Sequence, residues 1–385
     1  MRKCEVTSVK ISKKLRSSLI TYAMVILAYL ICQLAMSGEI DGFKMSRALK
    51  GQLVPICVYI VMAVSLNLTV GISGELSLGH AGFMSVGAFS GIIMSTWLLS
   101  AFGGSASALS FLADNKTVRL LLAIVSGGVF AGIAGVLIGI PVLRLRGDYL
   151  AIVTLAFGEI IRNVLNTLYF SVDGTALHVG FNSPDLAGKV IYNGPAGAVG
   201  VNKIATFDMG FVLVLFTLFV VLNLINSRSG RAIMAIRDSR IAAESVGLNV
   251  TKYKMMAFVT SAVLAGMAGA LYGLNFSTVT AAKFKFDTSI LVLVFVVLGG
   301  IGNIRGSVIA AAALTLLPEM LRSFSNYRML VYAIVLILVM LATNSPILKN
   351  LWAAIMRIRG MQALAERCAA WKAQLLPARK EGDAA

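Results

Sequence analysis

Long apolar runs alternate along the chain with short clusters of charged and turn-forming residues. A membrane-spanning helix needs about 20 mostly apolar residues, and ten runs come close to that length. They lie near residues 19–36, 53–70, 81–99, 120–142, 149–168, 211–225, 255–272, 287–302, 306–321 and 329–343. The pattern therefore predicts an all-α polytopic membrane protein with about ten transmembrane helices.

Composition strengthens this prediction. Apolar residues make up 58% of the 385 residues and charged residues only 13%, whereas a soluble domain carries about a quarter charged residues. So few charges cannot cover a water-exposed surface, which argues against a soluble, disordered or fibrous protein. The four cysteines (Cys4, Cys32, Cys57 and Cys368) show neither a disulfide framework nor a zinc-binding spacing, so no metal site is predicted.

The net charge of +17 would suggest a nucleic-acid partner in a soluble protein. In a membrane protein, Lys and Arg instead collect in the cytoplasmic loops. Residues 1–18 hold six of them, the 226–254 loop holds six and the tail after residue 344 holds seven, but the long 169–210 loop holds only two. With ten crossings, this bias predicts that both termini are cytoplasmic and that no nucleic acid is bound.

The chain then divides into a basic cytoplasmic N-terminus (1–18), a transmembrane domain (19–345) and a basic cytoplasmic tail (346–385). Apolar residues of the tail recur every three to four positions beside Arg and Lys, which is typical of an amphipathic helix on a membrane surface. At the other end, a cleaved signal peptide within residues 1–36 is the alternative. Its apolar stretch of 18 residues is longer than usual for a signal peptide, which favours a retained first helix.

Two sets of small residues predict close helix packing, because helices in lipid associate through small side chains. Each set recurs at spacings of three or four and therefore lies on one helical face. The sets are Gly128, Gly132, Gly135 and Gly139, and Ala262, Gly266, Gly269 and Gly273.

Two glycine-rich breaks interrupt the apolar pattern, at residues 71–83 and 299–306. Irregular backbone at membrane depth is tolerated where it is buried in protein or lines a water-filled cavity, and broken helices in transporters often lie beside the substrate pathway. One break in each half suggests a five-plus-five internal repeat; two ordinary tight turns are the alternative. The predicted pathway residues are Gly74, Ser77, Gly79, His80, Gly82, Gly299, Gly300 and Gly302.

The run Gly71-Ile72-Ser73-Gly74 also matches the Gly-x-Ser-Gly motif of intramembrane serine proteases. Such an enzyme needs a base beside the serine. His80 lies on the same short connection and His178 lies in the long 169–210 loop, so neither is placed on a separate packed helix. We therefore do not expect an enzyme.

Glu159 and Arg162 are ionisable residues within the fifth predicted span. Three positions apart on a helix, they can neutralise each other, and a structural ion pair is the interpretation adopted here. An ion-coupled secondary transporter of small organic solutes is the alternative function for the chain. It would normally place paired ionisable residues at mid-membrane, and only this pair comes close.

The 226–254 loop combines basic residues with Ile233, Ile236, Ile241 and Val246 among alanines. This spacing predicts short amphipathic helices, with Gly247 in the usual position just after a helix end. A compact helix rich in small residues is suited to enter a groove on a partner protein. A solvated basic loop is the alternative.

This loop resembles the coupling helix of the permease subunits of ATP-binding-cassette importers, which carries a Glu-Ala-Ala-x-x-x-Gly signature. Ala242, Ala243 and Gly247 fit that spacing, whereas Ile241 stands where the glutamate would be and Glu244 follows. The resemblance therefore implies that Ala242, Ala243, Glu244 and Gly247 couple the chain to an ATPase. The wider run 230–258, with the runs 145–159 and 298–306, is similar to the LivM-type permeases of branched-chain amino acid uptake systems.

The resemblance also implies partners: a second permease of the LivH type, two cytoplasmic ATP-binding subunits and an extracytoplasmic substrate-binding protein, assembled in the bacterial inner membrane. ATP and Mg²⁺ would bind to the ATPase subunits and no cofactor to this chain, which lacks a Gly-x4-Gly-Lys-Ser/Thr loop. Closure of the ATPases would push the helix around residues 240–248 and alternate access to a pathway between the two permeases.

The implied substrate is a branched-chain or related hydrophobic amino acid. Helix N-termini near Gly74 to Gly82 would meet its carboxylate, because the N-terminus of a helix favours negative charge. One departure concerns the substrate: the 169–210 loop matches the family's glycine-rich run only partly, through Gly174 and Thr175.

Overall fold

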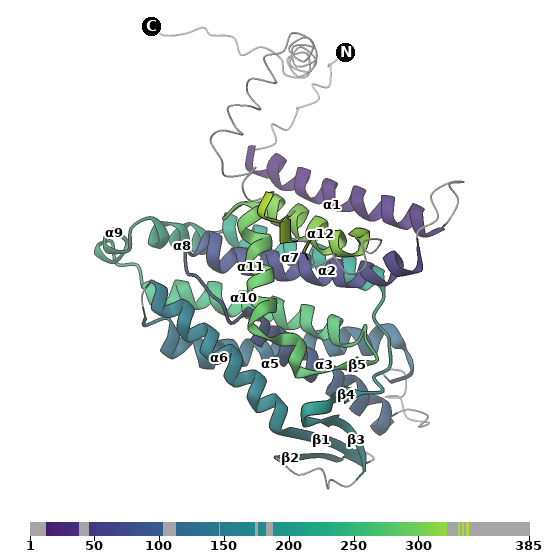
Figure 1. The fold of residues 1–385 in the computed structure, drawn as a ribbon. Coiled ribbons are helices and arrows are strands. Elements are labelled where there is room, and N and C mark those ends of the chain that lie inside the picture. The colour runs from purple at the N-terminus through teal and green to yellow at the C-terminus, as the bar shows by residue number, and fades with distance from the viewer. Residues whose placement is uncertain are drawn as a thin grey trace, which may run out of the picture. The chain divides into compact units, whose positions relative to one another are not determined.

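The computed structural model describes residues 13–37, 46–102, 113–145, 147–173, 176–181 and 188–321, with short helical pieces between residues 330 and 338. The chain divides into two compact units, Met1–Met320 and Leu321–Ala385, and every element named below belongs to the first (Figure 1). Most of the basic N-terminus, the whole 346–385 tail, most of the tenth predicted span, and Gly174 and Thr175 lie outside the described residues.

The first nine predicted spans each fall on a helix, with ends that differ by a few residues. The second continues into a short π-helix, η1 (Leu68–Ile72), and the eighth ends at Gly299, where Gly300 takes a φ of +92°. The helices are α1 (Lys13–Ser37), α2 (Arg47–Asn67), α3 (His80–Phe102), α5 (Lys116–Val142), α6 (Asp148–Thr167), α7 (Phe207–Asn226), α10 (Val250–Gly273), α11 (Phe286–Gly299) and α12 (Ile304–Met320).

Seven helices in the described part of the chain are long and apolar enough to cross a membrane: α1, α2 with η1, α3, α5, α6, α7 and α10. The apolar helix α11 has 14 residues and is shorter than a usual span. The molecule is thus mostly helical and has the character of a polytopic membrane protein. The count of ten spans stays a prediction.

Helix α10 lies at the centre of the fold, in contact with α2 on one side and with α3 and α5 on the other (Figure 1). Both predicted small-residue faces meet at these contacts. The glycines of α5 pack on α10, as Gly135 does on Ala262, and Gly273 packs on the backbone of Ala88 in α3. The prediction of close packing through small residues is confirmed.

The all-α prediction is wrong for the segment between α6 and α7. Strands β1 (Leu168–Asp173), β2 (Ala176–Phe181), β3 (Lys189–Asn193) and β4 (Gly197–Val199) form an antiparallel sheet with β5 (Thr278–Val279), in the order β2-β1-β3-β4-β5. Residues Leu168, Phe170 and Val172 alternate with polar ones, the period of a half-buried strand. A search for 20-residue apolar runs does not detect such short alternation.

Tyr192 fastens this sheet to the helices. Its ring meets that of Phe89 in α3, with centroids 4.6 Å apart, and its hydroxyl donates a hydrogen bond to the carbonyl of Leu165 in α6 (2.7 Å). Burial raises the pKa of Tyr192, so the hydroxyl stays a donor at physiological pH. The sheet is therefore an integral part of the fold.

Candidate functional site

The 226–254 segment folds into a pair of short helices, α8 (Arg228–Asp238) and α9 (Arg240–Ser245), rather than a solvated loop. Each begins at a serine cap: the Ser227 hydroxyl accepts a hydrogen bond from the amide of Gly230 (3.0 Å), and the Ser239 hydroxyl accepts one from the amide of Ala242 (3.4 Å). Serine is among the best residues for this position. The helix pair and the sheet lie at opposite ends of α10 (Figure 1), whose 24 residues span about 36 Å.

Helix α9 ends as the sequence predicts. Gly247 takes a φ of +86°, its amide donates to the carbonyl of Glu244 and the amide of Leu248 donates to the carbonyl of Ala243, both at 3.0 Å. This pair of hydrogen bonds is the Schellman motif, which favours glycine because a left-handed backbone strains residues with a Cβ. The helix end is confirmed, while its part in coupling stays a prediction.

The four predicted coupling residues do not share one surface. Ala243 is only 4% exposed and packs with Ile236 and Val250 of the same chain, so it holds α9 against α8 and α10, while its part in coupling stays a prediction. Ala242 is exposed, and Glu244 pairs with the Arg240 guanidinium (Nε to Oε1, 2.8 Å) one turn earlier on α9.

The residues that protrude from α9 are Ile241 and Val246, which are 83% and 81% exposed. Neither residue is in the coupling set predicted from the sequence, where their spacing predicts only short amphipathic helices. Ile233 and Ile236 of α8 are indeed buried. The sequence does hold one signal for Ile241. It stands where the Glu-Ala-Ala-x-x-x-Gly signature has a glutamate, and a position that accepts a charged residue is usually exposed.

We expect Gly247→Val to loosen the end of α9. The β-branched side chain costs about 1–2 kcal/mol at a positive φ, which corresponds to roughly 5- to 30-fold faster amide hydrogen exchange at Leu248. Gly247→Asn should change the exchange rate far less, since asparagine tolerates this backbone conformation. Equal exchange rates in the wild type and the valine variant would show that the Schellman motif does not hold α9.

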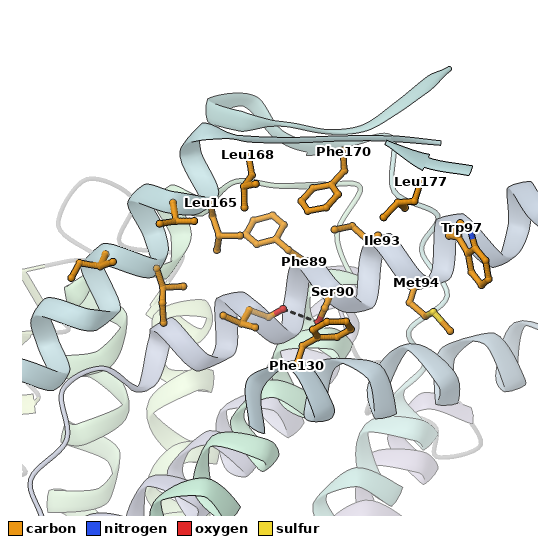
Figure 2. A pocket seen from close by; sticks show the side chains of 14 residues that line it. Phe89, Ser90, Ile93, Met94, Trp97, Phe130, Leu165, Leu168, Phe170 and Leu177 are labelled. Carbon is orange, nitrogen blue, oxygen red and sulfur yellow. Dashed lines mark hydrogen bonds between the residues drawn. The ribbon is translucent and has the colours of Figure 1, made fainter. Parts of the chain in front are cut away.

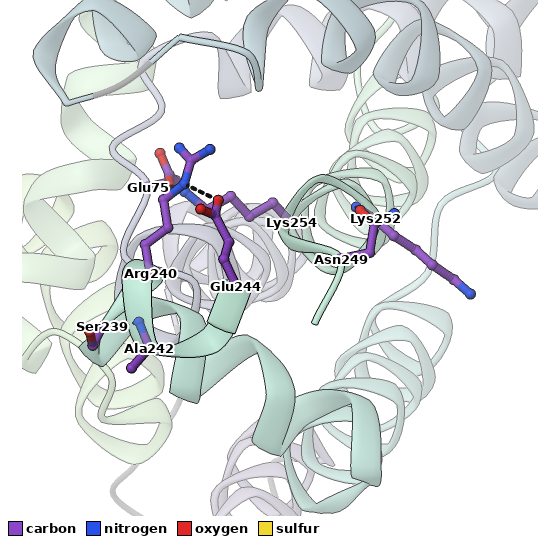
Figure 3. A network of polar contacts seen from close by, with 8 residues as sticks. All are labelled: Glu75, Ser239, Arg240, Ala242, Glu244, Asn249, Lys252 and Lys254. Carbon is purple, nitrogen blue, oxygen red and sulfur yellow. Dashed lines mark hydrogen bonds and ion pairs between the residues drawn. The ribbon is translucent and has the colours of Figure 1, made fainter. Parts of the chain in front are cut away.

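The first glycine-rich break is in contact with helix α8 of this pair. We call residues 68–79, which comprise η1 and the irregular segment that follows it, the α2–α3 break. Arg237 of α8 donates from Nη1 to the carbonyl of Gly71 (2.9 Å), and the Lys254 ammonium of α10 pairs with the Glu75 carboxylate (Figure 3). Gly74, at φ +75°, lies against Arg237 so closely that a Cβ there would come within 2.6 Å of the Arg237 Cγ.

The two breaks predicted from the sequence touch each other. The Asn67 side chain accepts a hydrogen bond from the amide of Gly302 (2.8 Å) and donates one to the hydroxyl of Ser307 (2.9 Å). Gly71 lies against the backbone of Gly302, and the added Cβ of any other residue would collide with it. These contacts favour a shared structural element over two unrelated tight turns.

Protein groups occupy three of the amides at the start of α3: those of Leu78 and Ala81 donate to the hydroxyls of Thr154 and Ser289, both at 3.0 Å, and that of Gly82 donates to the carbonyl of Gly79. A contact between this helix start and a substrate carboxylate stays a prediction. Other predicted pathway residues lie in tight packing. Gly79 meets Thr154, Gly82 meets Gly158, Gly299 meets Gly306 and the hydroxyl of Ser77 is buried.

His80 is buried, and its Nε2 lies 2.8 Å from the hydroxyl of Ser65 in α2. The imidazole is thus engaged with Ser65 rather than with Ser73 of the Gly-x-Ser-Gly run. The pairing that a serine protease needs is not formed, and His80 instead ties the start of α3 to α2.

Glu159 and Arg162 lie in ion-pair contact on α6 (Nε to Oε2, 2.7 Å). The second oxygen of Glu159 accepts a hydrogen bond from the amide of Phe286, the first residue of α11 (3.3 Å). A carboxylate at a helix N-terminus is favourable. The geometry therefore fits a structural role that joins α6 to α11.

A family model described as branched-chain amino acid transport system / permease component matches residues 49–340, which is well over half of the chain. The chain belongs to this permease family. No solved structure matches it.

Individual proteins that are similar to this permease support the same family. It is 34% identical over 304 residues to the high-affinity branched-chain amino acid transport system permease protein LivM of Salmonella typhimurium, a match that covers 74% of this chain and 66% of the relative. The probable LivM of Methanocaldococcus jannaschii is 27% identical over 65% of this chain and 74% of its own length. The ribose import permease protein RbsC of Escherichia coli K12 is 26% identical over 74% of this chain and 81% of its own.

The matched region spans 66% of the Salmonella LivM and of the Escherichia coli LivM, to which this permease is 33% identical. The chain thus covers slightly less than two thirds of these relatives. The shared part, residues 49–340, includes both breaks and the helix pair α8–α9.

The permease also contains an apolar cavity of about 800 Å³ among α3, α5, α6 and strands β1 and β2 (Figure 2). Ser90 carries the only hydroxyl among the lining residues, and this hydroxyl donates to the carbonyl of Val86 (2.7 Å). The cavity thus offers little to the charged groups of an amino acid. Within the described residues, no three His, Cys, Asp or Glu side chains gather as they would around a metal ion.

Proposed function

We propose that this chain is a membrane-spanning permease subunit of an ATP-driven importer, which moves branched-chain or related hydrophobic amino acids from an extracytoplasmic binding protein into the cytoplasm. It works with a second related permease and two ATP-binding subunits, which hold ATP and Mg²⁺. Family membership and the 34% identity to a LivM protein support this cargo over ribose, whose permease is 26% identical.

The observation that carries the proposal is the shape of helix α9. It is a short, doubly capped helix that protrudes from the bundle, with two exposed apolar side chains, Ile241 and Val246, on a basic segment. Exposed apolar side chains of this size on an ordered helix suit a groove on a partner. In the importer, this partner is an ATP-binding subunit.

The proposed topology places α8–α9 on the cytoplasmic side and the five-stranded sheet on the outer side, where the binding protein docks. The basic loop 226–254 and the sparsely charged 169–210 segment agree with this orientation. Ten spans with a five-plus-five repeat and cytoplasmic termini complete the arrangement in the bacterial inner membrane. One of the two touching breaks lies in each half.

The test is uptake of radiolabelled leucine into cells or vesicles that carry the chain with its co-expressed partners. We expect the tagged chain to co-purify with ATP-binding subunits, and uptake to need ATP and to persist when ionophores collapse the ion gradients. Uptake that follows the ion gradient and ignores ATP would instead support a secondary transporter and overturn the proposal.

A further inference from the structure

We infer that the Lys254–Glu75 ion pair and the Arg237–Gly71 hydrogen bond form the link through which motion of the helix pair α8–α9 reaches the α2–α3 break. This inference rests on the proposed function and names residues that position the moving parts. Both contacts join segments more than 150 residues apart in sequence: the separations are 179 and 166 residues.

The two contacts bracket α9. Arg237 is at the end of α8, immediately before α9, and Lys254 is near the start of α10, shortly after it. Both reach the same short stretch of the break, at Gly71 and at Glu75. A displacement of α9 is therefore transmitted to the α2–α3 break at two points. With one contact the break could rotate about it, whereas two contacts require the break to move with α9.

The Lys254–Glu75 pair is suited to transmit force because it is nearly buried. The side chains are 12% and 11% exposed, and Figure 3 shows them reaching toward each other from α10 and from the break. Separating a buried pair leaves an uncompensated charge, which is costly. The two elements are thus held to move together.

Arg237 is fixed in its direction by its own neighbour. Its Nε and Nη2 donate to the Asp238 carboxylate at 3.1 and 2.9 Å, which leaves Nη1 aimed at the Gly71 carbonyl. Gly74 lets the stem of Arg237 lie against the break, since a Cβ there would collide with it. The Arg237 side chain therefore holds α8 and the α2–α3 break at a fixed distance from each other.

From the break, the contacts continue into the C-terminal half. Gly71 packs on Gly302, which lies between α11 and α12. Asn67, the last residue of α2, bonds to Gly302 and to Ser307 in the first turn of α12. A shift of the α2–α3 break would therefore move the start of α12. The path from α9 to both breaks consists of packed or hydrogen-bonded contacts throughout.

The test measures leucine taken up per ATP hydrolysed by the full complex in membrane vesicles. We expect E75Q and K254M to lower this ratio about tenfold, within the usual range for coupling between two sites, in the complex that assembles, whose amount the loss of a buried partner also lowers. The charge-swapped variant, E75K with K254E, should recover most of the ratio. K252M is the matched control, because Lys252 is exposed on the same turn of α10 and points away from Glu75 (Figure 3).

A pair with a purely structural role would lower the amount of complex and leave uptake per ATP unchanged, and that result would overturn the inference. If the variants of the buried pair do not accumulate, R237M is the test. The Arg237 side chain is 38% exposed, so its loss should not prevent folding. An unchanged ratio of leucine taken up to ATP hydrolysed in R237M would also overturn the inference. Wild-type complex without ATP-dependent uptake would instead refute the proposed function, and the inference with it.

Discussion

Replacing both Ile241 and Val246 with aspartate should abolish uptake while the permease still folds and inserts. Both side chains are more than 80% exposed, so their loss removes no contact within the chain. Residues that form the hot spot of an interface contribute about 2 kcal/mol or more each, and two buried charges add a desolvation penalty. We expect an approximately hundredfold loss of ATP-dependent leucine uptake and loss of co-purifying ATP-binding subunits.

The matched control is the conservative double variant I241V with V246I, which keeps both positions apolar and should transport normally. Ala243→Asp makes a useful contrast. Ala243 is buried against Ile236 and Val250, so its variant should lower the stability of the helix pair itself. If the double aspartate variant kept its ATPase partner and its uptake, α9 would not be the docking helix.

The second large effect is expected for Gly87→Ala in α3. The added methyl group would collide with the backbone of Gly266 in α10, including its carbonyl oxygen. Backbone atoms cannot rotate aside as a side chain can, so the two helices must separate. Overpacking of a core costs typically 1–3 kcal/mol, and we expect about 3 kcal/mol here, because α10 is in contact with α2, α3 and α5.

The measurement is thermal unfolding of the purified permease in detergent, together with its abundance in the membrane. Gly51→Ala is the control: Gly51 lies in helix α2, and an added Cβ there meets no atom within 4 Å. Alanine is favoured over glycine in helices by up to about 1 kcal/mol, so this variant should be as stable as the wild type or slightly more so. Equal melting of the Gly87 and Gly51 variants would contradict the packing argument.

Much of the helical fold was accessible from the sequence because it depends on local pattern. A run of apolar residues long enough to span the membrane predicts a helix wherever it occurs, and nine such predictions fall on helices. The short strands escaped this search, since Thr278–Val279 becomes strand β5 only by pairing with β4. No pattern within two residues reveals such a partner.

The candidate site also has features that local pattern predicts and features that depend on distant contacts. The glycine at 247 predicts a helix end, because a left-handed backbone is a local requirement. Which side of α9 faces its own chain is a different question. Ala243 is buried and Ile241 is exposed, the reverse of what their polarity suggests, because Ile236 and Val250 pack beside Ala243. The exposed apolar surface of α9 therefore could not be predicted from the sequence.

Local sequence pattern is enough to predict the long apolar helices, the places where small residues let helices approach, and the breaks in the apolar pattern. The contact of Gly71 with Gly302, the pairing of Lys254 with Glu75 and the addition of β5 to the sheet become known only from the folded chain. The first group follows from the periodicity and composition of neighbouring residues. The second depends on contacts between segments that are tens to hundreds of positions apart, which local propensity does not encode.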